Sequence, residues 1–73
     1  MSPVVPNDGD RVVFVRQDGF HDIENVKDGA VTSTGRQGIA SAAQAREIAR
    51  ADLDGGRVLL RRHDSPDVFE VWN

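Results

Sequence analysis

The stretch that decides the fold is Ser41–Asp54, which reads Ser-Ala-Ala-Gln-Ala-Arg-Glu-Ile-Ala-Arg-Ala-Asp-Leu-Asp and precedes Gly55-Gly56. Ser41 and Gln44 have the spacing of a capping box. In that motif the serine hydroxyl accepts a hydrogen bond from the Gln44 N–H, and the Gln44 side chain reaches back to the N–H of Ser41. Gly55 stands where a left-handed residue commonly ends a helix. The sequence therefore predicts an α-helix over residues 41–54.

The predicted helix is amphipathic. Residues spaced three and four apart share one face. The apolar face consists of Ala42, Ala45, Ile48, Ala49 and Leu53. Its small alanines let the helix lie close to a sheet, with Ile48 and Leu53 as the large anchors. Ile48→Asp is expected to unfold the domain because it would bury an unpaired charge.

Short segments on either side of the helix have the composition of strands, with β-branched and aromatic residues between turn residues. The predicted strands are Arg11–Arg16, Phe20–Val26, Ala30–Thr34, Arg57–His63 and Val68–Trp72. Phe20–Val26 is ambiguous, because its apolar residues recur every three positions, as in a helical turn. A strand is favoured there because the preceding Asp18-Gly19 is typical of a hairpin connection. Asp64–Asp67, which contains Pro66, is predicted to be the turn of a closing antiparallel hairpin.

The predicted element order is strand, strand, strand, helix, strand, strand. This order indicates an α+β domain with a small antiparallel or mixed sheet and one helix packed on one face. Residues 1–10 contain Pro3 and Pro6 and are expected to be a flexible N-terminal segment, so that residues 11–73 form the single domain. Arg11–Arg16 places valines on both of its faces, which predicts either a central strand or a strand covered by a dimer partner.

Composition limits the classes of function. The chain has 73 residues, a net charge of −3 and no cysteine. Disulfides and thiolate metal sites are therefore excluded, and a partner or a homodimer is expected to add to a small core. No apolar run is long enough to span a membrane, so no membrane partner is expected and a cytoplasmic location is the default prediction.

One set of residues could carry acid–base or metal chemistry: His21, Asp22 and Glu24, with His63 and Asp64 elsewhere in the chain. Their spacing matches no established ligand pattern. The chain also lacks a nucleophile motif, and a domain of this size has little room for a cleft. No catalytic, metal or cofactor site is predicted, and a non-enzymatic role is expected.

A basic loop, Gly35-Arg36-Gln37-Gly38, precedes the helix and weakly resembles the Gly-x-x-Gly loop of KH nucleic-acid-binding domains, which clamps a nucleic-acid backbone. If Phe20–Val26 were helical, the element order would match a minimal KH module. The polar Thr32–Thr34 departs from the apolar residues of that family. If the chain binds nucleic acid in this way, the loop, the helix and the last hairpin supply the arginines. The candidates are Arg36, Arg46, Arg50, Arg57, Arg61 and Arg62.

A broader resemblance covers residues 12–71. It rests on Thr32–Thr34, on Ala43-Gln-Ala-Arg-Glu-Ile-Ala-Arg50 and on Gly55-Gly-Arg-Val-Leu-Leu60. These stretches resemble a family of small prokaryotic domains of unknown function, which combine an early β-hairpin, an Ala-x-x-x-Ala-Arg-Glu-x-Ala helix and a closing hairpin. The sequence departs from the family at Phe20–Ile23 and at Asp64–Asp67. The resemblance implies a fold and no catalytic residues.

Two functional hypotheses follow. The first is a non-enzymatic protein-interaction domain that presents the sheet face opposite the helix, or a free strand edge, to a protein partner or a second copy. The alternative is a nucleic-acid-binding module that uses the six arginines and whose affinity falls with salt.

Overall fold

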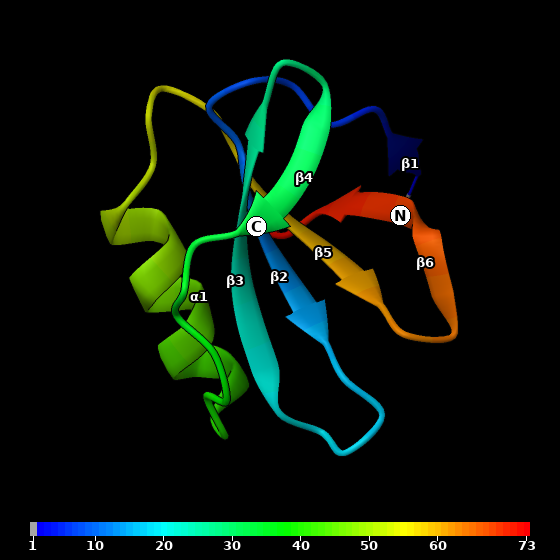
Figure 1. Cartoon of the computed structure of the whole chain (residues 1–73), viewed down its shortest axis with the longest axis vertical. Helices are drawn as coiled ribbons and strands as arrows, with labels where there is room; N and C mark the ends of the chain where they lie inside the picture. The colour runs from blue at the N-terminus through cyan, green and yellow to red at the C-terminus, as the bar shows by residue number, and fades with distance from the viewer. Residues whose placement is uncertain (1) are drawn as a thin grey trace.

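The computed structural model describes residues 2–73. Its elements in chain order are β1 (Pro3–Val4), β2 (Arg11–Val15), β3 (His21–Lys27), β4 (Ala30–Ser33), α1 (Ala42–Ala51), β5 (Val58–Arg62) and β6 (Ser65–Val71). The strands form one sheet in the order β1-β6-β5-β2-β3-β4, with α1 beside it (Figure 1). β2 and β5 are parallel, and the other strand pairs are antiparallel. The predicted α+β fold with a mixed sheet is confirmed.

The helix begins where the sequence predicts. The Ser41 hydroxyl accepts a hydrogen bond from the Gln44 N–H at 3.2 Å, and α1 starts at Ala42. It ends at Ala51, three residues before the predicted end, because Asp52 already leaves the helical conformation and acts as the C-cap. The Asp54 N–H donates instead to the carbonyl of Gly9 at 3.4 Å. The chain after Asp52 is thus drawn toward the N-terminal segment.

The alanine side of α1 faces the sheet. Ala45 and Ala49 are fully buried in a core with Val13, Ile23, Val58 and Leu60. Ile48 and Leu53, the predicted large anchors, are half-buried and pack against this core. Ala42, which was assigned to the same face, is the first residue of α1 and is exposed.

The ambiguous segment is a strand. β3 pairs with β2 as an antiparallel hairpin, with Val13 opposite Ile23 and Val15 opposite His21. Ile23 lies in the core under α1, and Val26 lies in a second core on the other face of the sheet. Both faces are therefore buried, so a three-residue apolar spacing suits a strand as well as a helix. The helical alternative, and with it the KH-like element order, is not formed.

The closing hairpin turns earlier than predicted. His63 and Asp64 make the turn, and Ser65 already pairs with Arg62. Pro66 lies in β6 and not in the turn. The β5–β6 register is irregular between Leu60 and Arg62, and β1 covers β6 only at Phe69 and Glu70. A proline is tolerated at such an uncovered, irregular edge because no ladder hydrogen bond is lost there.

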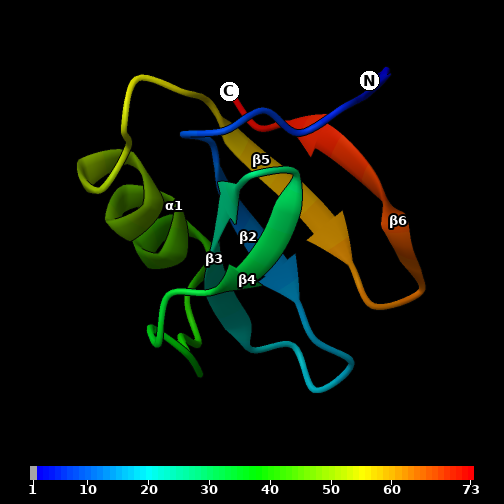
Figure 2. The same ribbon diagram turned by 45° about the horizontal axis from the view of Figure 1, so that its top comes forward.

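The face of the sheet opposite α1 is covered by the chain itself. Val12 and Leu59 have no exposed surface there, and Val26 has little. Residues from the outer strands pack on them: Val4, Val31, Phe69 and Val71. Figures 1 and 2 show how the β3–β4 hairpin bends over the sheet to do so. β2 is thus a central strand, and no dimer partner is needed to bury its second apolar face.

The start of the chain joins the sheet. Pro3 and Val4 form β1 and pair with Glu70 and Phe69, although the two prolines near the start argued against regular structure. A two-residue edge strand can contain proline because its outward N–H is not needed for pairing. Met1 lies outside the described residues, and Asp10, the last residue of the segment, is only 1% exposed.

Candidate interaction surfaces

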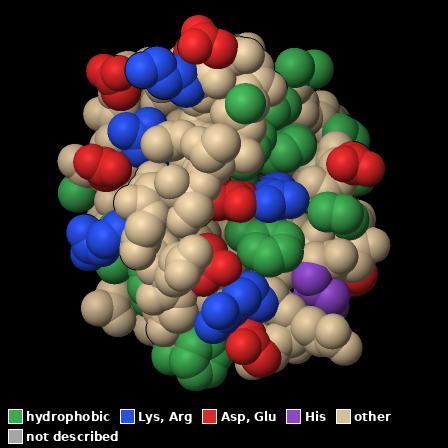
Figure 3. All heavy atoms as spheres, viewed as in Figure 1, with side chains coloured by type: hydrophobic (Ala, Val, Ile, Leu, Met, Phe, Trp, Pro, Cys, Tyr) green, Lys and Arg blue, Asp and Glu red, His purple; other side chains and the backbone are tan. Residues whose placement is uncertain are grey.

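Arg61, one of the six nominated arginines, is engaged within the domain. Its Nε and Nη2 donate to the two carboxylate oxygens of Glu24, each at 2.7 Å. The guanidinium also lies 4.3 Å from the centroid of the Phe14 ring. The hydrogen bond from Arg61 to Glu24 outweighs burial and raises the pKa of Arg61. In the view of Figure 3, acidic and basic side chains lie side by side around a hydrophobic patch. Arg61 is therefore committed to Glu24 rather than to a ligand.

Arg57 is joined to a buried acid. Asp10 Oδ1 accepts the Arg57 N–H at 2.7 Å, and Asp10 Oδ2 accepts from the Arg57 guanidinium at 3.1 Å and from the Asn7 N–H at 2.8 Å. Burial alone would raise the pKa of Asp10, but these hydrogen bonds and the charge of Arg57 lower it below its ordinary value. The contact fastens the N-terminal segment to the start of β5. The Arg57 charge is largely balanced by it.

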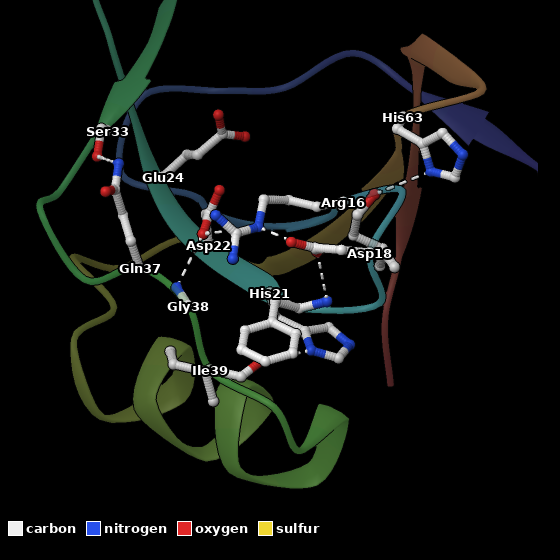
Figure 4. Close-up of polar contacts among 12 residues, drawn as sticks. Arg16, Asp18, His21, Asp22, Glu24, Ser33, Gln37, Gly38, Ile39 and His63 are labelled. Atoms are coloured by element: carbon white, nitrogen blue, oxygen red, sulfur yellow. Dashed lines mark hydrogen bonds and ion pairs between the residues drawn. The ribbon is translucent and has the colours of Figure 1, made fainter.

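The Gly-x-x-Gly loop follows the edge of β3. The Gly38 N–H donates to Asp22 Oδ1 at 3.0 Å (Figure 4), and the Arg36 carbonyl accepts from the Ile23 N–H at 2.8 Å. Gly35 and Gly38 have φ values of 89° and 71°, a region that favours glycine. The backbone amide of Gly38 is thus used within the fold, and Arg36 contributes only its exposed side chain to the surface.

The histidines do not meet. His21 is buried and its Nδ1 donates to the Ile39 carbonyl at 2.8 Å, whereas His63 Nδ1 lies 3.4 Å from the Val15 carbonyl. Figure 4 shows the two rings in different parts of the molecule. Within residues 2–73, no three histidine or carboxylate side chains are arranged to hold a metal ion. Asp22 and Glu24 serve as hydrogen-bond acceptors for Gly38 and Arg61.

Three of the six arginines do converge. Arg46 and Arg50 of α1 and Arg57 before β5 border a hollow of about 200 Å³. The rest of its lining is mostly apolar and comprises Leu53, Val58, Val71, Trp72 and Asn73. We call this hollow the arginine groove. Arg36 and Arg61 do not line it, and neither does Arg62, which is half exposed and lies 3.5 Å from Glu70. The six arginines therefore do not form one basic surface.

The outer edge of β4 is the second candidate surface. β4 ends the sheet and has β3 as its only neighbouring strand in the described chain. Its residues Ala30–Ser33 carry no charge and no proline. The opposite edge of the sheet holds Pro3 in β1 and Pro66 in β6, with Pro6 just after β1. Natural sheets protect edges with charges and prolines, so the β4 edge is the unprotected one.

Two residues that organise these surfaces were not nominated from the sequence. Asp10 was placed in a flexible segment, although an Asp before a strand and after an Asn-Asp-Gly turn is a common loop anchor. Trp72 was predicted as the end of the last strand; it packs on the core under α1 and also lines the arginine groove. Its second role depends on which side chains surround it, and nothing local in the sequence reports that.

Comparison of the chain with known protein families, with curated proteins and with solved structures gives no significant match. The one helix in residues 2–73 is too short and too polar to cross a membrane.

Proposed function

We propose that this protein is a non-enzymatic protein-interaction domain that pairs through the outer edge of β4, with a second copy of the chain as its partner. The unprotected Ala30–Ser33 edge is the observation that supports this proposal most directly. An exposed strand edge offers a row of unpaired backbone groups that another strand can extend.

The backbone of β4 fixes the register of such a pair. The Thr34 N–H donates to the Ile23 carbonyl at 3.1 Å. The backbone N–H and C=O groups of Thr34 and Thr32 therefore point toward β3. Because hydrogen bonding alternates along an antiparallel strand, Val31 and Ser33 turn their backbone groups outward. Two copies related by a twofold axis at Thr32 would pair Val31 of each with Ser33 of the other.

Charge favours the same register. Asp28 precedes β4 and Arg36 follows it, so a twofold axis at Thr32 brings the Asp28 end of each copy next to the Arg36 end of the other. Both residues are exposed. A symmetric pair would therefore contain two Asp28–Arg36 contacts, each worth about 0.2–1 kcal/mol at a surface.

The test is the molar mass measured by size-exclusion chromatography with light scattering over a concentration series. The wild type is expected to reach the mass of a dimer as concentration rises. Val31→Pro is expected to be monomeric because it removes an outward N–H, and Val31→Ala controls for lost packing and should still dimerise. A monomer at every concentration, or a dimer that survives Val31→Pro, contradicts the proposal.

The register has its own test. Asp28→Arg and Arg36→Asp should each weaken dimerisation, since each places like charges opposite one another. The double variant Asp28→Arg/Arg36→Asp restores opposite charges and should recover dimerisation. Additive weakening in the double variant would show that these two residues do not face each other.

Nucleic-acid binding is the second proposal, and the convergence of Arg46, Arg50 and Arg57 on one groove favours it. The net charge of −3 and the pairing of Arg57 with Asp10 oppose it. A gel shift with single-stranded oligonucleotides at low and high salt tests it, because phosphate contacts weaken as salt rises. Absence of a shift at low salt removes this second proposal.

A further inference from the structure

The arginine groove is a second surface, away from β4, and its lining has two chemically distinct parts. The apolar lining residues are Leu53, Val58, Val71 and Trp72. The lining also includes three arginines, which we call the rim: Arg46, Arg50 and Arg57. A hollow of about 200 Å³ exceeds the roughly 150 Å³ that hold a benzene molecule in a protein interior, so one large apolar side chain fits it.

Arg46 is held in place on this rim. Its guanidinium carbon lies 5.9 Å from the centroid of the Trp72 ring, which is the geometry of a cation–π contact. Its Nε is buried and has no hydrogen-bond partner among the described residues. The backbone of Trp72 is fixed in turn, because its N–H donates to the Val58 carbonyl at 2.9 Å. The aromatic ring and the cation that borders it are thus positioned before any ligand arrives.

The rim offers a small number of free positive charges. Arg57 is paired with Asp10 at 3.1 Å, whereas neither Arg46 nor Arg50 has an acidic partner within salt-bridge distance in residues 2–73. Arg46 and Arg50 are four residues apart on α1, so they project from the same side of the helix. Two adjacent guanidinium groups match one or two carboxylates. A long polyanion would need more cations than these and would meet a chain of net charge −3.

From this combination we infer that the arginine groove binds a peptide segment of a partner protein in which an acidic side chain neighbours a large apolar one. The apolar side chain enters the hollow against Trp72, and the carboxylate pairs with Arg50 and Arg46. An acidic side chain is the expected source of the carboxylate because the rim presents guanidinium forks, which carboxylates meet in a bidentate manner. A chain-terminal carboxylate is more often held by a nest of backbone N–H groups.

The chain contains its own reporter for this test. Trp72 is its single tryptophan, and the chain has no tyrosine, so tryptophan emission reports on the groove alone. The probe is an N-acetylated, C-amidated hexapeptide of alternating leucine and glutamate. Two control peptides replace all leucines by glycine, or all glutamates by glutamine. A short oligothymidylate tests the competing occupant.

The leucine–glutamate peptide is expected to change Trp72 emission saturably, and both control peptides are expected to bind at least about tenfold more weakly. Arg50→Gln should weaken the leucine–glutamate peptide about tenfold as well, since it removes one charged hydrogen-bond donor. Arg62→Gln is the matched control, because Arg62 is an exposed arginine outside the groove, and it should leave the affinity unchanged.

Three results would overturn the inference. One is no change in Trp72 emission with any peptide. Another is equal binding of the glycine–glutamate peptide, which would mean that charge alone acts. The third is oligothymidylate binding that exceeds peptide binding and is lost in Arg50→Gln, which would assign the groove to nucleic acid. Val31→Pro should not change peptide binding, so failure of the β4 proposal and failure of this one are separable.

Discussion

Removing the carboxylate of Asp10 should destabilise the domain strongly. In Asp10→Ala the backbone N–H groups of Asn7 and Arg57 lose their acceptor, and the Arg57 guanidinium loses its charged partner. With about 1 kcal/mol for each backbone N–H and about 1.5 kcal/mol for the charged hydrogen bond, the expected cost is about 3–4 kcal/mol. Domains of this length have a total stability of only about 4–11 kcal/mol. The variant should therefore lose between about a quarter and nearly all of the stability of the domain.

The assay is urea unfolding at neutral pH, followed by Trp72 emission and by circular dichroism. The free energy of unfolding is compared between the wild type, Asp10→Ala and Asp10→Asn. Asp10→Asn keeps the shape of the side chain and one acceptor oxygen, so it should cost less than Asp10→Ala. A cost below about 1 kcal/mol for Asp10→Ala would refute the reasoning, because it would mean that these hydrogen bonds add almost nothing to stability.

The same residue predicts a dependence on pH. The pKa of Asp10 is lower in the folded protein than its ordinary value of 3.8, so the ionised form favours folding. Its stabilising contribution is complete above the ordinary pKa and is lost as pH falls through the lower folded pKa. The difference in unfolding free energy between the wild type and Asp10→Asn should therefore shrink from about pH 5 to about pH 2. A constant difference over that range would contradict the assignment.

Three further predictions use thermal and urea unfolding as the measurement. Gly56→Ala should cost about 3 kcal/mol, because the added Cβ would lie 2.5 Å from backbone and side-chain atoms of Asp10. Gly29→Ala is its control and should cost only about 1–2 kcal/mol, since φ is 78° there but space is open. Arg61→Lys should cost about 1–2 kcal/mol, because lysine cannot donate to both oxygens of the carboxylate partner. Ala49→Leu should cost about 1–3 kcal/mol by overfilling the contact between α1 and the sheet, whereas Ala43→Leu on the exposed side should be near neutral.

The elements that could be predicted are those with local causes. Ser41 caps α1 through a contact three residues away, and the alternation in β2 reflects the two faces of one strand. The end of α1 could not be predicted, because Asp54 is drawn away by Gly9, a residue distant in sequence. Pro66 was expected in a turn but lies in the irregular strand β6. This position is possible because β1 pairs with β6 only at Phe69 and Glu70 and leaves the Pro66 edge uncovered.

The surfaces were less predictable than the fold. The six arginines are equivalent in the sequence. In the fold Arg61 pairs with Glu24 and Arg57 pairs with Asp10, whereas Arg46 and Arg50 line the arginine groove without an acidic partner in residues 2–73. These assignments depend on which strands become neighbours, and in particular on the parallel β2–β5 pair. The apolar second face of β2 suggested an external partner, but the curl of the sheet supplies its cover instead.

The unequal distribution of proline between the two edges of the sheet has a consequence for how far assembly can proceed. If both edges accepted new strands, copies could add one after another without limit, as in a fibril. The side with Pro3 and Pro66 disfavours additions, and in the proposed dimer the β4 side is the one that accepts a strand. Once two molecules join through β4, only their proline-bearing sides face outward, so growth terminates at a closed pair.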